Sequence, residues 1–143
     1  MKKLIFTFLI LTIGFQVKAQ ITDPLVSDCS LTAGPNTKYL KDFRIQLGKA
    51  EAGEELRYKS QISLWKNTKY RFTLCNARNS TGKLILSIVD ETDKVILSSY
   101  DRKTGKTYPY VDFICNKSGV YKLHFDFHEG KEGSGIGIVS MVK

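Results

Sequence analysis

Apolar and polar side chains alternate with a period of two through most of the chain after residue 38, and this pattern constrains the fold more than any other feature. Between positions 43 and 47, Phe, Ile and Leu alternate with Arg and Gln; between 121 and 127, aromatic residues and Leu alternate with Lys, His and Asp. Successive side chains of a strand point to opposite faces of its sheet, so the alternation predicts strands buried on one face.

Turn-forming residues interrupt these runs at short intervals and divide them into about eight strands. No run has the apolar spacing of a helix of three turns. The pattern therefore predicts an all-β protein, a single jelly-roll-like β-sandwich of about eight strands over residues 39–143. The turns are expected at Gly48 to Gly53, Asn67-Thr68, Asn79 to Gly82, Asp90 to Asp93, Lys103 to Lys106, Ser118-Gly119 and Gly130 to Gly135.

Residues 1–19 have the three parts of a secretory signal peptide. Two lysines precede an apolar stretch over residues 4–15, and Val17 and Ala19 are small residues suited to a cleavage site. We therefore expect an exported protein, periplasmic or extracellular, that is not membrane-spanning. The next segment, residues 20–38, is rich in Asp, Ser, Thr and Pro and is expected to form an N-terminal lead-in.

The chain has three cysteines, Cys29, Cys75 and Cys115, so at most one disulfide bond can form within it. An oxidising compartment favours such a bond. We expect Cys75–Cys115, because each of these residues ends a predicted strand and is followed by Asn. Strict alternation places Cys75 on the polar face of its strand and Cys115 on the apolar face, so this bond needs a bulge or a sheet edge; Cys29 is the other candidate partner.

The segment from Tyr70 to Phe127 contains the strings YRFTL, LILSIVDETDKVILSS and YVDFICNKSGVYKLHFDF. With its Asp-centred turn and its step Ser118-Gly119-Val120-Tyr121, it resembles the bacterial pre-peptidase C-terminal domain family, a small jelly-roll-like β-sandwich appended to exported proteases and other secreted enzymes. The GOLD β-sandwich of secretory-pathway cargo proteins has a similar Gly-x-Tyr step. Membership of the first family would imply a non-catalytic binding or stabilising module, and it carries over no specific functional residue.

Sequence motifs of catalysis and cofactor binding are missing. There is no Gly-x-Ser-x-Gly and no His-Glu-x-x-His. His124, Asp126 and His128 share one predicted strand face, but its two histidines would lie about 13 Å apart, so we expect a solvated face and no metal. Gly133 to Gly137 precedes a strand, not the helix that a phosphate-binding loop needs, so we expect a flexible turn or a kinked edge strand. We expect no cofactor and no enzymatic activity.

An aromatic and basic cluster is the strongest candidate for a binding site. Tyr and Arg combine a large contact area with a polar tip. The loop Asp101 to Thr107 has three cations beside one Asp, so we expect it to be positive, mobile and ligand-facing. Trp65 and Tyr108 also suit a structural role at the ends of the sandwich. The predicted ligand-binding residues are Trp65, Tyr100, Arg102, Lys103, Tyr108 and Tyr110.

These features predict an exported, non-catalytic module that binds a glycan or protein in the cell envelope or outside the cell. We expect an acidic glycan or protein as the partner and no nucleic acid, because the protein is exported. The alternatives are a structural or assembly subunit that acts through a strand edge and, third, a hydrolase. A shallow face lined by Trp65 and the tyrosines would favour ligand binding, a long unpaired edge strand the assembly role, and an open cleft with two facing carboxylates the enzyme.

Overall fold

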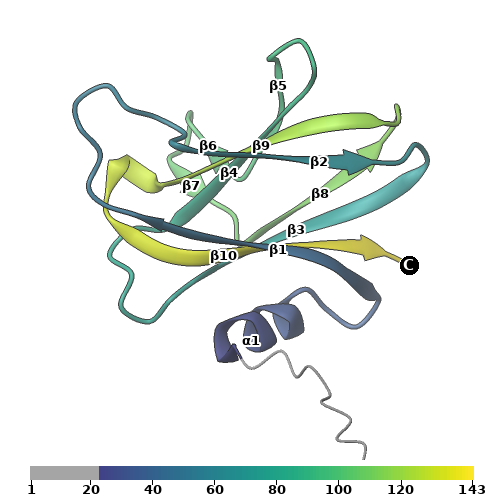
Figure 1. Cartoon of the computed structure of the whole chain (residues 1–143), viewed down its shortest axis with the longest axis horizontal. Coiled ribbons are helices and arrows are strands. Elements are labelled where there is room, and N and C mark those ends of the chain that lie inside the picture. The colour runs from purple at the N-terminus through teal and green to yellow at the C-terminus, as the bar shows by residue number, and fades with distance from the viewer. Residues whose placement is uncertain (1–22) are drawn as a thin grey trace, which may run out of the picture.

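The computed structural model describes residues 23–143, and the signal peptide predicted over residues 1–19 lies outside them. Figure 1 shows two layers of strands with a helix on the outside of one layer. None of the helices in the described residues is long and apolar enough to cross a membrane. In chain order the elements are α1 (Pro24–Thr32), β1 (Thr37–Leu47), β2 (Tyr58–Leu64), β3 (Thr68–Asn76), β4 (Leu84–Val89), β5 (Val95–Ser98), β6 (Tyr100–Asp101), β7 (Lys106–Thr107), β8 (Tyr110–Cys115), β9 (Gly119–Phe127), the 3-10 helix η1 (His128–Gly130) and β10 (Gly133–Val142).

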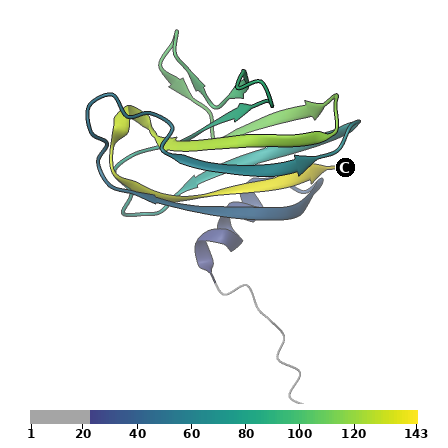
Figure 2. The ribbon, with the colours of Figure 1, turned by 45° about the horizontal axis from the view of Figure 1, so that its top comes forward.

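Eight of the strands form two four-stranded antiparallel sheets packed face to face. The first sheet has the order β1-β10-β3-β8 and the second the order β2-β9-β4-β5, while β6 and β7 form a small separate hairpin. The pairing is nested, with β1 beside β10, β2 beside β9, β3 beside β8 and β4 beside β5. This nesting is that of a jelly roll, so the predicted all-β sandwich is confirmed. Figure 2 shows the two layers from a second direction.

The core lies between the two sheets and consists of the apolar sides of the predicted strands. Phe43 and Ile45 of β1, with Leu123 and Phe125 of β9, are all 5% exposed or less and belong to one buried cluster. The rings of Phe43 and Phe125 join the two sheets, with their centroids 5.6 Å apart. The period-two alternation therefore identified the buried face of these strands correctly.

The helix α1 covers the outer face of the first sheet. Its Val26 and Cys29 pack against Ile136 and Ile138 of β10. Because the opposite face of β10 lies on the core, this strand is buried on both faces. The lead-in predicted over residues 20–38 thus contains a packed helix and the first two residues of β1.

The disulfide bond joins Cys29 of α1 to Cys75 of β3, with Cα atoms 5.8 Å apart, and Cys115 is a buried free thiol. The predicted bond Cys75–Cys115 is therefore wrong. Both residues do lie near the ends of strands, but β3 and β8 are antiparallel, so the C-terminal ends of these strands lie at opposite ends of the sheet. Cys115 is in register with Thr68, at the start of β3. Cys75 does point to the outer face, where α1 brings Cys29 to it.

The glycine-rich segment forms the first half of β10, which lies between β1 and β3. The interpretation of this segment as a flexible turn or a kinked edge strand is therefore wrong. A Cβ atom at Gly133 would lie 2.4 Å from the ring of Phe127, and one at Gly137 would lie 2.6 Å from the ring of Phe125. The two glycines leave space for aromatic rings of the facing sheet.

Gly137→Ala is expected to lower the free energy of unfolding by about 1–3 kcal/mol, because the added methyl group displaces the Phe125 ring in a packed core. Urea unfolding followed by circular dichroism measures the change. Gly119→Ala is the matched control, since a Cβ there meets no atom within 4 Å, and its effect should stay within about 0.5 kcal/mol. Equal losses in the two variants would contradict the proposed steric conflict.

Candidate functional site

A cleft of about 590 Å³ lies between the loop that follows β1 and the β6–β7 hairpin, and we call it the loop–hairpin cleft. Its volume falls within the range of small-ligand sites in proteins. The loop, the hairpin and the short helix η1 each contribute polar side chains to its walls. These side chains are Glu51, Glu54, Glu55, Tyr100, Arg102, His128 and Glu129.

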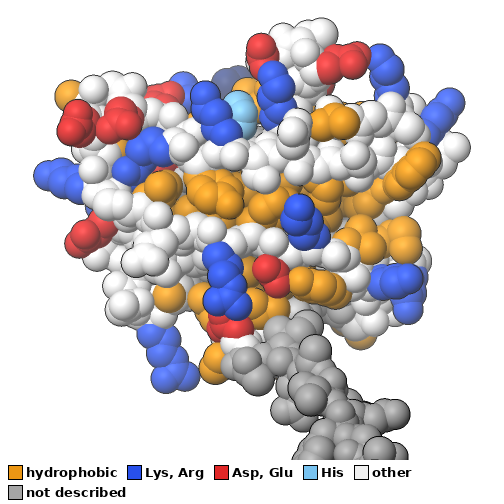
Figure 3. All heavy atoms as spheres, in the orientation of Figure 1, with side chains coloured by type: hydrophobic (Ala, Val, Ile, Leu, Met, Phe, Trp, Pro, Cys, Tyr) orange, Lys and Arg blue, Asp and Glu red, His pale blue; other side chains and the backbone are white. Residues whose placement is uncertain are grey.

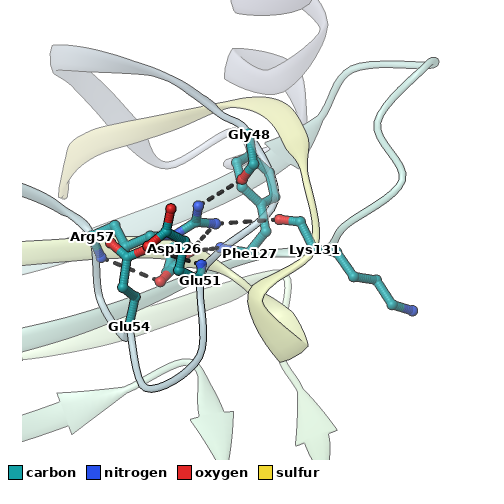
Figure 4. A network of polar contacts seen from close by, with 7 residues as sticks. All are labelled: Gly48, Glu51, Glu54, Arg57, Asp126, Phe127 and Lys131. Carbon is teal, nitrogen blue, oxygen red and sulfur yellow. Dashed lines mark hydrogen bonds and ion pairs between the residues drawn. The ribbon is translucent and has the colours of Figure 1, made fainter.

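A buried ion pair anchors the loop beside this cleft. Arg57 donates to one carboxylate oxygen of Asp126 from Nε at 3.0 Å and from Nη2 at 2.9 Å. Its Nη1 donates to the carbonyl of Gly48 at 2.6 Å. The side chains of Arg57 and Asp126 are only 12% and 4% exposed. Arg57 therefore ties both ends of the loop, residues 48–57, to the end of β9 (Figure 4).

His124, Asp126 and His128 were predicted to share a solvated strand face, and this prediction is wrong for Asp126 and His128. Asp126 is 3% exposed and is held by Arg57. His128 lies beyond the end of β9, in η1, where its ring packs against Tyr100 with 4.7 Å between centroids. Across residues 23–143, no group of three or more His, Cys, Asp or Glu side chains is placed to hold a metal ion.

The predicted loop Asp101 to Thr107 forms a short β-hairpin. The backbone N–H of Gly105 donates to the carbonyl of Asp101 at 2.8 Å, and the N–H of Lys103 donates to the Asp101 carboxylate, also at 2.8 Å. Gly105 has a φ of 70°, a conformation that glycine adopts without steric cost. These contacts give the turn a defined shape.

Two of the predicted ligand-binding residues, Tyr100 and Arg102, line the loop–hairpin cleft. Arg102 also contacts the carboxylate of Glu55 at 3.2 Å. The sequence analysis set only Asp101 against the three cations of the hairpin, and Glu55 is a second acid beside them. The additional acid comes from 47 residues earlier in the chain, so no local pattern could place it there.

Three other predicted residues, Lys103, Tyr108 and Tyr110, do not line the loop–hairpin cleft. Lys103 is exposed at the tip of the hairpin. Tyr108 is 40% exposed and lies under the Lys106 amine, 5.0 Å from its ring centroid. Tyr110 lies on the outer face of the first sheet, with the guanidinium of Arg71 4.6 Å from its ring centroid. Each tyrosine is thus covered in part by a cation of the same chain.

Trp65 lies apart from the tyrosines. It is 70% exposed in the turn between β2 and β3, next to the start of β3. Tyr110 is in register with Thr73, near the other end of β3. A shallow face lined by Trp65 together with the tyrosines is therefore not formed.

The four glutamates of the cleft were missed by the sequence reasoning. The segment Glu51–Glu55 contains three of them, and the predicted turn Gly48 to Gly53 included only the first. Three acids within five residues of a long loop were a visible signal of an acidic wall. Glu129 follows the end of β9, and no sequence signal connects it to the others.

A second hollow, of about 350 Å³, lies on the outer face of the second sheet, and we call it the basic hollow. It is lined by Lys59, Ser60, Gln61, Asp93, Lys122 and His124. Burial, followed by the charges of Lys59 and Lys122, lowers the pKa of His124, and Asp93 acts in the opposite direction. The contact between Lys122 and Asp93 leaves Lys59 as the lysine of this hollow that has no ion pair in residues 23–143.

Comparison with known proteins identified no relative: no model of a protein family matches the chain, and no curated protein matches it. The resemblance to the pre-peptidase C-terminal domain family therefore stays a prediction.

Proposed function

We propose that the protein is an exported, non-catalytic module that binds a glycan of the cell envelope or the extracellular space in the loop–hairpin cleft. One observation carries this proposal: Tyr100 and Arg102, two of the residues chosen from the sequence, meet a wall of carboxylates in a cleft whose loop is anchored by a buried ion pair. The disulfide bond between Cys29 and Cys75 supports export, because such bonds persist in oxidising compartments.

The chemistry of the cleft suits sugar hydroxyls. The carboxylates of Glu51, Glu54 and Glu55 accept hydrogen bonds, and the guanidinium of Arg102 donates them. The rings of Tyr100 and His128 pack together and add an apolar surface beside these groups. Anchoring of the loop by Arg57 reduces the entropy that binding would otherwise cost. The excess of carboxylates favours uncharged sugars over acidic ones in the cleft itself.

The same carboxylates are poorly suited to glycoside hydrolysis. A glycosidase needs one carboxyl group held protonated in an apolar environment near a second, ionised one. Here the side chains of Glu55 and Glu129 are 69% and 64% exposed, and each contacts a cation. Glu54 accepts a hydrogen bond from the backbone N–H of Glu51 at 2.8 Å. These contacts favour binding over acid catalysis.

The proposal is tested with the double variant Tyr100→Ala/Arg102→Gln. An array of envelope and extracellular polysaccharides identifies a ligand, and calorimetry measures its affinity. We expect an affinity loss of about tenfold or more, because both polar and apolar contacts are removed from the cleft. Trp65→Ala is the control, since this exposed residue lies away from the cleft, and it should leave the affinity unchanged.

Three outcomes would contradict the proposal. Loss of binding in the Trp65→Ala control would place the ligand at the other end of the sandwich. Release of reducing sugars from the ligand would identify a hydrolase. Binding that survives the cleft variant but is lost in Ile114→Lys would favour the assembly role, in which an extended partner segment pairs with the edge strand β8. Ile114 is 63% exposed there, beside a hollow of about 400 Å³ that also contains Ile96 and Val120.

A further inference from the structure

The basic hollow and the loop–hairpin cleft are neighbours on the outer face of the second sheet. His124 lies between Lys59 of β2 and Ser87 of β4 in the strand register. Asp126, which lines the cleft, is two residues further along β9, and same-face residues at this spacing lie about 7 Å apart. A short oligosaccharide can therefore reach both sites at once.

The positive charges of the hollow are brought together by the register of two strands, β2 and β9. Lys59 is directly opposite His124, and Lys122 lies two residues from His124 on the same face. Like charges in directly opposite positions of a sheet destabilise each other. Asp93, from the turn after β4, contacts Lys122 and offsets its positive charge. The remaining charge of Lys59 faces solvent without a carboxylate partner in residues 23–143. Figure 3 shows Lys and Arg side chains, with a His among them, along the upper part of the face in view.

We propose that the basic hollow is an anion subsite that binds the carboxylate of an acidic sugar, in a polysaccharide whose neighbouring uncharged sugars occupy the loop–hairpin cleft. This inference rests on the function proposed above for the cleft. Electrostatics set the direction in which the oligosaccharide binds, because the carboxylates of the cleft repel the acidic sugar and Lys59 and Lys122 attract it. Gln61 and Ser60, in the same hollow, supply hydrogen-bonding groups for hydroxyls.

Binding at this subsite should strengthen as the pH falls. The charged groups that face His124 are Lys59 from β2, Lys122 on its own strand and Asp93 from the turn after β4, while Asp126 is paired with Arg57. Without a ligand, burial and the two lysines hold the pKa of His124 below its ordinary value. A bound carboxylate favours the imidazolium and raises this pKa. By linkage, the affinity for the anion must rise as the pH falls through the pKa of His124.

The test compares glucuronosyl-xylotriose, which has one acidic sugar beside three uncharged ones, with its methyl ester, which has the same sugars without the charge. Calorimetry at pH 5.5 and pH 8 measures both ligands on the wild type and on Lys59→Gln/Lys122→Gln. We expect this variant to bind the charged ligand roughly threefold to tenfold more weakly and the ester unchanged. Lys66→Gln, an exposed lysine of the β2–β3 turn, is the matched control and should bind both ligands as the wild type does.

A titration of the His124 ring signals by NMR gives a second readout. The pKa of His124 should rise in the presence of glucuronosyl-xylotriose and stay unchanged with the ester. No binding of glucuronosyl-xylotriose at pH 5.5, equal affinities for the two ligands, or an equal pKa rise with inorganic sulfate would overturn the inference. If Tyr100→Ala/Arg102→Gln binds both ligands as the wild type does while the lysine variant loses only the charged one, the cleft proposal fails and the anion subsite remains.

Discussion

Arg57→Met is expected to lower the free energy of unfolding by about 3–5 kcal/mol, because it leaves the buried carboxylate of Asp126 without its counter-charge. Asp126 is 4% exposed in its side chain, and it loses the two hydrogen bonds that the guanidinium donates to it. The carbonyl of Gly48 loses a donor as well. Urea unfolding monitored by circular dichroism measures the loss.

Two further variants make this result specific. Lys117→Met removes the exposed pair between Lys117 and Glu91, whose side chains are 76% and 68% exposed, and should cost less than about 1 kcal/mol. The paired replacement Arg57→Met/Asp126→Leu removes both buried charges and should recover much of the stability lost in the single variant. If Lys117→Met lowered the free energy of unfolding as much as Arg57→Met does, burial of the Arg57–Asp126 pair would not explain the loss.

Removal of the disulfide bond by Cys29→Ala/Cys75→Ala is expected to lower the free energy of unfolding by about 4 kcal/mol. The bond closes a loop between residues 46 positions apart, and in the chain-entropy model a loop of this length restricts the unfolded chain by about that amount. Loss of the contacts between α1 and β10 adds to the effect. Comparison of urea unfolding for the oxidised wild type and the variant measures the difference.

Thiol counting checks the pairing itself. The unreduced wild type should release one reactive thiol only after unfolding, because Cys115 is free and buried. A Cys115→Ser variant should retain its disulfide bond, and its mass should show no free thiol. Two free thiols in that variant would instead support the pairing of Cys75 with Cys115 that the sequence had suggested.

The sequence predicted those features that depend on neighbours along the chain. Alternation placed Phe43 and Ile45 of β1 and Phe125 of β9 on the buried face, and all three are in the core. It also placed Cys75 on the outer face. The two-residue period is a local property of extended backbone, so a correct count of alternating positions is enough to assign a face.

Part of the candidate site was also predicted from the sequence. Tyr100 and Arg102 were chosen for their chemistry, and both line the cleft. The glutamates of the cleft were not chosen, because Glu55 meets Arg102 only where a loop 47 residues earlier in the chain approaches the hairpin. Asp126 occupies a position that alternation assigns to solvent, yet the 48–57 loop folds over it and Arg57 reaches it.

The sequence by itself therefore determined an all-β chain, its strand periods, the faces of its core residues and two of the residues that line the loop–hairpin cleft. The tertiary structure alone decided that β1 pairs with β10 and β2 with β9, that Cys29 is the partner of Cys75, and that Arg57 is buried with Asp126. The physical reason is the range of the interactions. Alternation is set by backbone geometry within a few residues, whereas strand pairing, disulfide choice and ion-pair burial follow from which distant segments the closed sandwich brings together.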